Sequence, residues 1–242
     1  MQANLPPISE IWVYLSGSPL LALVLTLSAY LLGLTLYERS DRNPLANPVL
    51  IAVILVSLSI KLLDMPYVKY FEGAQFVHFL LGTATVSLAI PIYKGFASLK
   101  GRMGILMLAL LAGGVTSIFT AIGMARWLGV NESLVQGLVA KSVTAPIAMG
   151  IAERVQASPT LTAIFAVSTG ILGAVLGRYV LDALRITAWW QRGFALGVAA
   201  HGIGTSRAFS VNPEAGAYAS LGMGLHGILG AVLIPYAAAW WF

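Results

Sequence analysis

The sequence predicts an all-α polytopic membrane protein, and three observations lead to that prediction. Of the 242 residues, 58% are hydrophobic and only 10% are charged, whereas a soluble domain carries roughly 25% charged residues. The mean hydropathy of +0.85 indicates more apolar surface than one water-soluble core can bury. The charges also cut the chain into apolar intervals, each close to the ~20 residues that a helix needs to cross a bilayer. We therefore expect one transmembrane domain over residues 1–242, with short loops and no soluble catalytic domain.

Six uncharged intervals are each about one membrane span long, and two more reach that length only if Lys141 and Arg207 are allowed inside them. The expected total is seven to eight membrane segments. Residues 1–17 are expected to lie along the interface, residues 18–128 to form a first helical half, and residues 129–242 a second half. In chain order the intervals are 11–37, 43–60, 73–93, 103–125, 132–154, 155–177, 191–214 and 215–242.

Charge and composition exclude several classes of function. The net charge of +5 comes from few charges on an apolar chain, so it reports topology and does not indicate nucleic-acid binding. The absence of cysteine excludes disulfides, thiolate nucleophiles and cysteine metal sites. The sequence contains no H-E-x-x-H, G-x-S-x-G or P-loop motif, so we do not expect an enzyme.

The basic residues of short loops predict orientation only for the first half of the chain. The loops after the first and third intervals carry Arg39 and Arg42, and Lys94 and Lys100, which places both loops in the cytoplasm. For the second half two topologies stay open. If residues 132–154 cross the membrane fully, the loop at 185–192 with its two arginines lies outside; if they form a re-entrant hairpin, it lies inside.

Three apolar intervals are interrupted near their middles by small polar or charged residues, at 82–85, 141–146 and 201–207. Non-helical backbone at mid-membrane depth survives only where it is buried in protein or lines a wet cavity. In transporters such interruptions recur in both halves of the chain and mark the substrate site. We therefore expect two or three discontinuous or re-entrant helices, arranged in a pattern compatible with an inverted repeat.

The interruption at 141–146 has the most specific chemistry. Pro146 suits the first turn of a helix and Thr144 or Ala145 its cap, so a half-helix is expected to begin here with its positive dipole end at mid-membrane. Lys141 adds a full charge, and Ser142 and Thr144 add hydroxyl donors. Because helix N-termini bind anions, these residues predict a site for a small carboxylate.

Two other roles for Lys141 stay open, pairing with Glu132 or Glu153 and reaching a lipid headgroup. Its central position makes the second role difficult, and ionisable residues inside membranes usually serve function. Glu153 and His201 are also the candidate proton sites if transport is coupled to H⁺. Na⁺ is the other candidate coupling ion, and we expect no cofactor and no metal.

The second candidate site is the interruption at 201–207. Glycines let the backbone bend and approach a ligand, His201 can carry a proton near neutral pH, and Arg207 could hold a carboxylate by two contacts. The alternative is a tight turn in which Arg207 pairs with Glu214. The candidate binding residues here are His201, Gly202, Gly204, Thr205 and Arg207.

Other polar residues in the apolar intervals are expected to serve structure. His226 lies among glycines that favour close helix packing, and a lone histidine in such a seam usually hydrogen-bonds across it. Asn43 and Asn47 each precede a proline, which is typical of caps and turns.

The ordered polar and glycine motifs of the second half resemble the signature of the LrgB/CidB membrane proteins. The resemblance is strong from about Asn131 to Pro235 and extends more weakly to the second apolar interval. It covers the LrgB-like portion alone. The segments that carry it are 140–149, 161–163, 169–177, 200–208, 214–217 and 227–229.

The resemblance implies two classes of function. Bacterial members are described as holin-like or antiholin-like regulators of murein hydrolase export and lysis, usually beside a four-span LrgA/CidA partner. Some are linked to pyruvate uptake, and a similar portion occurs in the plastid glycolate/glycerate transporter. We expect a transporter of small 2-oxo or 2-hydroxy monocarboxylates in the bacterial inner membrane, with a holin-like regulator as the alternative. The expected partners are the carboxylate, lipid, an LrgA/CidA-like protein and further copies of the chain, but not nucleic acid.

Overall fold

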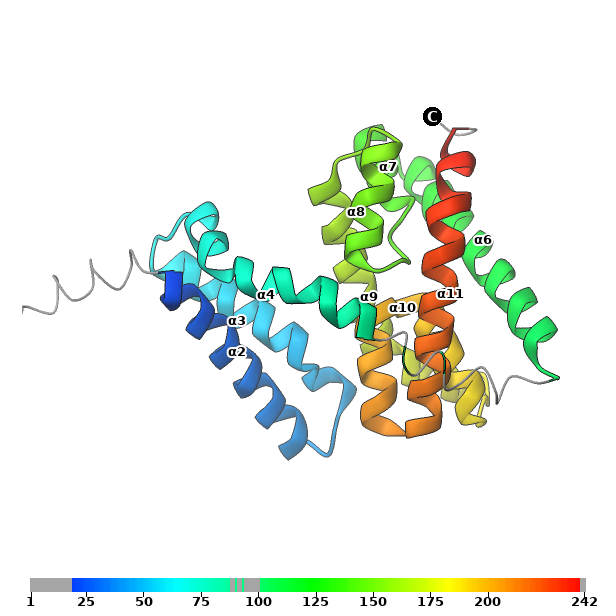
Figure 1. Cartoon of the computed structure of the whole chain (residues 1–242), viewed down its shortest axis with the longest axis horizontal. Helices are drawn as coiled ribbons and strands as arrows, with labels where there is room; N and C mark the ends of the chain where they lie inside the picture. The colour runs from blue at the N-terminus through cyan, green and yellow to red at the C-terminus, as the bar shows by residue number, and fades with distance from the viewer. Residues whose placement is uncertain (1–18, 88–89, 91–92, 94–100, 240–242) are drawn as a thin grey trace, which may run out of the picture. The chain divides into compact units, whose positions relative to one another are not determined.

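The computed structural model describes residues 19–87, 90, 93 and 101–239, so the predicted interfacial segment 1–17 lies outside it. Over this part of the chain there are nine α-helices, one 3-10 helix and no strand, which confirms the all-α prediction (Figure 1). The elements are α2 (Pro19–Arg39), η1 (Pro44–Ala46), α3 (Pro48–Leu62), α4 (Tyr67–Ser87), α6 (Met103–Trp127), α7 (Glu132–Leu138), α8 (Ala145–Arg154), α9 (Pro159–Ala183), α10 (Trp189–Val211) and α11 (Pro213–Ala238).

Each helix falls on one of the apolar intervals, and four are long and apolar enough to cross a membrane. Among the described residues these are Leu20–Arg39 in α2, then α6, α9 and α11. The helix α3 is apolar but shorter, with 15 residues. The structure thus supports a membrane protein, and the predicted total of seven to eight segments stays a prediction.

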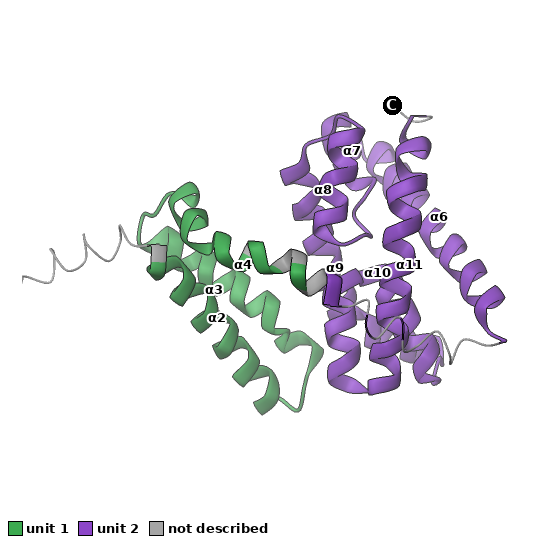
Figure 2. Cartoon of the chain, viewed as in Figure 1, with its two compact units in different colours: residues 1–85 green, residues 86–242 purple. Residues whose placement is uncertain are grey.

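The chain divides into two compact units, residues 1–85 and residues 86–242 (Figure 2). The sequence-based division into halves placed the boundary at residue 128. The second unit therefore holds α6 in addition to the helices of the LrgB-like half. That all 242 residues act as one transmembrane domain stays a prediction.

In the first unit, α2 packs against α3 and α4. A Cβ atom on Gly33 would lie 2.7 Å from the Pro48 carbonyl oxygen, so a glycine is needed where α2 approaches the start of α3. The Thr26 and Tyr70 hydroxyls share a hydrogen bond of 2.7 Å. The side chain of Asn47 accepts hydrogen bonds from the first turn of α3, which confirms its predicted role as a cap.

The predicted interruption at 82–85 is wrong, because α4 continues through it to Ser87. The Thr83 hydroxyl donates to the Leu80 carbonyl oxygen over 2.9 Å. This bond satisfies the Thr83 hydroxyl within its own helix, so Thr83 does not require a break.

In the second unit, α6 and α11 run in the same direction. Near their starts, Arg102 donates a hydrogen bond to the Tyr218 hydroxyl over 3.4 Å. Near their ends, Ile122 and Ala125 pack with Ala238 in one buried cluster. We call end A the end of this unit where α6 and α11 begin, and end B the opposite end.

The first limb of α10, residues 189–200, runs parallel to α11. A Cβ on Gly193 would lie 2.0 Å from the Ala215 carbonyl oxygen, and one on Gly197 would lie 2.0 Å from that of Ala219. The two backbones therefore touch, which only glycine permits at these positions. Figure 1 shows α10 and α11 side by side.

The helix α9 runs in the opposite direction, from end B to end A. Cβ atoms on Gly177 and Gly173 would each meet a side chain at 2.5 Å, the first that of Leu196 and the second that of Ala200. Residue numbers rise along the first limb of α10 in the direction in which they fall along α9, so these two helices are antiparallel. Since the first limb of α10 leaves end A, α9 must arrive there.

α10 is two half-helices that fold back on each other. A Cβ on Gly204 would lie 2.6 Å from both the Ala200 Cβ and the Leu196 carbonyl oxygen, whereas eight residues of continuous helix span about 12 Å. The break is at His201, whose φ is 40° and ψ −129°. The second limb, residues 202–211, returns to end A, where α11 begins after Asn212.

The segment that contains α7 and α8 also leaves and returns to one end. It follows α6, which ends at end B, and it precedes α9, which begins there. Val135 of α7 and Ile151 of α8 are buried in the cluster that contains the end of α6. Within the structure, the segment thus folds back like α10, but from the opposite end of the unit.

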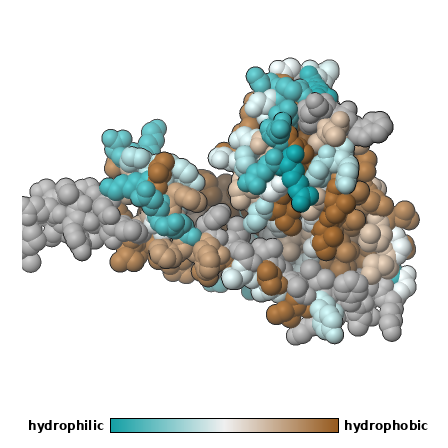
Figure 3. All heavy atoms as spheres, turned by 45° about the horizontal axis from the view of Figure 1, so that its top comes forward, coloured by the Kyte–Doolittle hydropathy of each residue, from teal (hydrophilic) through white to brown (hydrophobic). Residues whose placement is uncertain are grey.

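The surface agrees with insertion into an apolar medium. Large hydrophobic side chains are exposed on α6, α9 and α11, among them Leu108, Leu172 and Ile228 at 58–70% exposure. Figure 3 shows hydrophobic surface on both units, with hydrophilic residues gathered toward one end of the second unit. An exposed apolar surface of this kind marks membrane or protein contact.

Candidate functional site

Residues 139–144 join α7 to α8 without helical structure, which confirms the interruption predicted at 141–146. Thr144 takes the N-cap position in extended conformation and Pro146 lies in the first turn of α8. The proline fits there because a first-turn N–H has no intrahelical partner in any case. The N-terminus of α8 is therefore formed by the predicted residues.

The hydroxyl of Thr144 is buried and makes no hydrogen bond within the described part of the chain. It does not bond to the first turn of α8, although this is the usual role of an N-cap threonine. A buried polar atom without a partner costs about 1–3 kcal/mol. The Thr144 hydroxyl is therefore available to a ligand at the N-terminus of α8.

Lys141 lies in the same connection, half-buried, and its ammonium donates a hydrogen bond to the Ser117 hydroxyl over 3.0 Å. Ser117 is near the middle of α6, so Lys141 lies at about mid-height in the unit. Among the described residues no carboxylate forms an ion pair with Lys141, and Glu132 pairs with Arg126 instead. The predicted alternative pairing of Lys141 with Glu132 is therefore wrong.

Ser142 is buried, and its hydroxyl shares a hydrogen bond of 3.0 Å with Nε2 of His226. His226 lies at the middle of α11, and Gly114 of α6 leaves room for its ring, since a Cβ there would lie 3.1 Å from the ring. This confirms the expectation that His226 bonds across a helix seam. Its partner, Ser142, belongs to the connection between α7 and α8. We call this connection, residues 139–144, the α7–α8 tip, and His226 holds it against α11.

The tip of α10 is formed by His201, which is 4% exposed. Its Nε2–H donates to the Ala166 carbonyl oxygen over 2.8 Å, and the Thr205 hydroxyl donates to the His201 carbonyl oxygen over 2.7 Å. A Cβ atom on Gly170 would lie 2.7 Å from the His201 ring. The glycine at the middle of α9 therefore leaves room for this ring. A positive φ at a non-glycine residue costs about 1–3 kcal/mol, and such strain is typical of functional sites.

Both tips lie near the middle of the unit, where the described side chains include the Lys141 ammonium and no ion-paired carboxylate. His201 at the tip of α10 bonds to Ala166, which belongs to the same buried cluster as Ala140 and Val143 of the α7–α8 connection. Two half-helices also begin at the tips, α8 and the second limb of α10, with their positive dipole ends. By contrast, the acidic residues of this unit are all exposed at helix ends. They are Glu132, Glu153, Asp182 and Glu214.

The other predicted site residues lie in different places. Gly204 is buried where the two limbs of α10 touch, whereas Gly202 is partly exposed, with the Met223 sulfur 4.0 Å from where a Cβ would stand. Glu153 is exposed near end B, far along the chain from the tip of its own hairpin. Arg207 lines a pocket near end A together with Arg178 and Arg192, and that lining contains no tip residue.

Two residues that bond to the α7–α8 tip, Ser117 of α6 and His226 of α11, were not among the predicted site residues. Ser117 could have been found from the polar run Thr116-Ser117 inside an apolar span, because such a run needs a partner in a membrane. His226 was expected to hydrogen-bond across a helix seam, but it was not expected to bond to Ser142 of the predicted site. Within the described residues no cluster of three metal-ligating side chains occurs.

Comparison with known proteins gives the family. The residue pattern of the LrgB-like family matches residues 26–240. The uncharacterized protein YwbG of Bacillus subtilis is 35% identical over 90% of this chain and 96% of its own length. The Holin-like protein CidB of Staphylococcus aureus (strain Mu50) is 28% identical over 89% and 94%, and YxaC of B. subtilis is 31% identical over the same shares. No solved structure matches the chain. The chain belongs to the LrgB-like family.

Proposed function

We propose that the protein is a membrane transporter for small monocarboxylates, which bind at the two tips. The observation that carries the proposal is that two folded-back segments, one from each end of the unit, have their tips at mid-height against one buried cluster. There Lys141 supplies a charge that no described carboxylate neutralises. The Thr144 hydroxyl supplies a donor with no partner of its own among the described residues.

The lengths of the helices suit this arrangement in a bilayer. The helices α6 and α9 have 25 residues each, or about 37 Å, which exceeds the ~30 Å hydrocarbon layer. The helix α8 has 10 residues, or about 15 Å, so it reaches the midplane and no further. In this proposal α7–α8 and α10 are re-entrant, and they enter from opposite faces as an inverted pair.

The substrate class follows from the charge and from the family. An anion at the tips meets Lys141 and the starts of two half-helices, which together stabilise one negative charge. A 2-oxo or 2-hydroxy group adds one more oxygen, for which the Thr144 hydroxyl is a partner. The resemblance to proteins linked to pyruvate uptake and to glycolate and glycerate transport supports acids of two or three carbons.

Coupling to H⁺ is proposed to use His201, because Glu153 is exposed near end B. Protonation of the His201 ring would add a second positive charge at the tips and strengthen anion binding. Na⁺ stays the other candidate ion. We also propose the bacterial inner membrane as the location and an LrgA/CidA-like protein or further copies of the chain as partners.

A holin-like regulator of murein hydrolase export is the second candidate, favoured by the name of the S. aureus relatives, Holin-like protein CidB. A pore of that kind needs an open path but no selective anion site. The Lys141 ammonium at the tips therefore supports transport. The name of the S. aureus relatives fits the regulator at least as well.

Proteoliposomes distinguish the two functions. We expect the wild-type protein to take up labelled pyruvate or glycolate and to retain a trapped dye larger than either acid. The Lys141→Ala variant should lose uptake, whereas Lys61→Ala, which removes an exposed lysine of the first unit, should keep it. Dye leakage that is equal in wild type and Lys141→Ala would overturn the transporter in favour of the pore.

A further inference from the structure

A pocket of about 430 Å³ opens beside α10 near end A, away from the tips. Three arginines line it, Arg178 of α9 and Arg192 and Arg207 of α10, and Asp182 is the one acidic residue of its lining. The lining therefore carries a net charge of about +2 by this count. We propose that the pocket binds the phosphate of an anionic phospholipid headgroup.

The pocket is already arranged around one anion, the carboxylate of Asp182. Arg192 donates to one carboxylate oxygen over 2.6 Å, and the Arg178 guanidinium is 3.6 Å from the other. Arg192 also donates to the Ile186 carbonyl oxygen over 2.8 Å, which fixes its guanidinium. Arginine forks bind phosphate by parallel hydrogen bonds, and this lining brings three arginines to one pocket.

The rest of the lining indicates a lipid in preference to a small soluble acid. Six aliphatic side chains, Ala208 among them, and Trp189 form the apolar part of the wall, and a two- or three-carbon acid would leave most of that surface wet. The Arg192 guanidinium lies 5.7 Å from the centre of the Trp189 ring. Tryptophan beside arginine at a span end is typical of the headgroup region. The aliphatic residues include Ala174, Leu181, Leu196, Val211 and Ala215.

The position of the pocket is also where anionic lipid is found. Five arginines of this unit lie at or near end A (Arg102, Arg178, Arg185, Arg192 and Arg207) and two near end B (Arg126 and Arg154), so the positive-inside rule places end A in the cytoplasm. Basic pockets between membrane helices on that side bind anionic headgroups. Arg192 lies on the first limb of α10 and Arg207 on the second, so a bound phosphate would link the two limbs and stabilise the hairpin.

The test compares thermal unfolding of the full chain in nanodiscs of phosphatidylcholine alone and with phosphatidylglycerol added. We expect phosphatidylglycerol to raise the Tm of the wild type by about 5–10 °C, for a lipid at about 100 times its dissociation constant. The Arg178→Gln/Arg207→Gln variant should lose this rise. The matched control, Arg154→Gln/Arg185→Gln, removes the same charge from two exposed arginines that do not line the pocket, and it should keep the rise.

Three results would overturn the proposal: no rise in the wild type, an equal loss in the control, and the same rise when inorganic phosphate is added to phosphatidylcholine discs. The last would assign the pocket to a free anion. If the double variant does not fold, Arg178→Gln alone carries the test, since the Arg178 side chain is 57% exposed and its ion pair is long. Uptake of carboxylate has no part in this readout, so it stands apart from the proposed function.

Discussion

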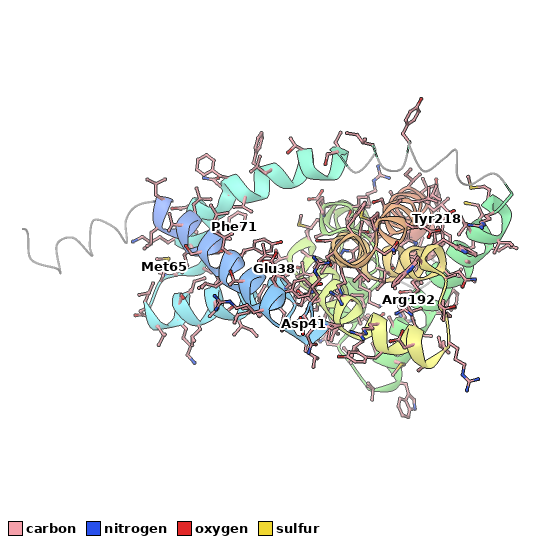
Figure 4. All side chains as sticks on the ribbon, turned by 90° about the horizontal axis from the view of Figure 1, so that it is seen from below. Glu38, Asp41, Met65, Phe71, Arg192 and Tyr218 are labelled. Carbon is pink, nitrogen blue, oxygen red and sulfur yellow. The ribbon has the colours of Figure 1, made fainter. Side chains whose placement is uncertain are left out.

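The guanidinium of Arg102 lies 4.9 Å from the centre of the Trp190 ring. Arg102 occupies the N-cap position of α6, and Trp190 lies in the first turn of α10. Both helices therefore begin at end A, where Tyr218 and Arg192 also lie (Figure 4). Since α9 returns from end B to end A, the α7–α8 segment must begin and end at end B. This contact favours the hairpin over the full crossing, the two topologies that the sequence left open, and the re-entrant topology in the membrane stays a prediction.

The hairpin predicts which loops face the same side of the membrane. The chain has no cysteine, so single substitutions at exposed positions give a clean background. Ser133→Cys and Thr160→Cys flank the α7–α8 segment, and an impermeant maleimide should label both from the same side of oriented vesicles. Ala183→Cys, at the other end of α9, should be labelled only from the opposite side.

A full crossing by residues 132–154 would instead place Ser133 and Thr160 on opposite sides. Labelling of Ala183→Cys together with Thr160→Cys would show that α9 does not cross. The uptake activity of each variant serves as the control that the labelled protein is folded.

Close backbone contact between α10 and α11 predicts a strong effect of one methyl group. In Gly197→Ala the new Cβ would lie 2.0 Å from the Ala219 carbonyl oxygen, and the helices must separate. We expect a loss of about 3 kcal/mol, the upper end of the usual cost of overpacking. Gly123→Ala in α6 is the matched control, because nothing lies within 4 Å of its Cβ position. Thermal unfolding should show a large drop in Tm for the first variant and none for the second.

The hydrogen bond between Ser142 and His226 predicts energetic coupling between the α7–α8 tip and α11. Removing either partner leaves the other buried and unsatisfied, which costs about 1–3 kcal/mol. Ser142→Ala, His226→Leu and the double variant form a mutant cycle, and stability should show a coupling of at least about 0.5 kcal/mol. Strict additivity would mean that the two side chains do not bond.

Thr144 and Thr205 are both buried, but only the second is hydrogen-bonded within the described chain. Thr144→Val should therefore leave the Tm unchanged or higher, while the affinity for carboxylate falls about fivefold, the value of one hydrogen bond of about 1 kcal/mol. Thr205→Val should lower stability by about 1 kcal/mol, since the His201 carbonyl loses its partner. Unchanged affinity in Thr144→Val would remove that hydroxyl from the site.

Sequence alone was sufficient for the all-α class and for the start of α8, while the binding chemistry of the tips stays a prediction. The apolar intervals gave each helix, and the Pro146 and Thr144 pair placed the start of α8. The chain leaves helical structure before α8, where Thr144 is the N-cap residue and Pro146 lies in the first turn, and at His201, whose φ is positive. The run at 82–85 stays helical, and its Thr83 hydroxyl bonds to the Leu80 carbonyl oxygen.

Sequence was not sufficient for what depends on contacts between distant segments. Neither Ser117 as the partner of Lys141 nor His226 as the partner of Ser142 follows from spacing, since each pair joins different helices. Arg207 lies within a few residues of His201, and the sequence grouped them in one site. The backbone reversal at His201 instead places Arg207 on a limb that returns to end A, beside Arg192.

Direct binding of pyruvate or glycolate to the purified chain tests the central claim most directly. Isothermal titration in detergent should detect a heat of binding for the wild type. It should show a loss of at least about tenfold in affinity for Lys141→Ala, since removing a charged partner costs about 1.5–3 kcal/mol. Lys141→Arg should keep part of that affinity. Equal affinity in wild type and Lys141→Ala would contradict an anion site at the tips.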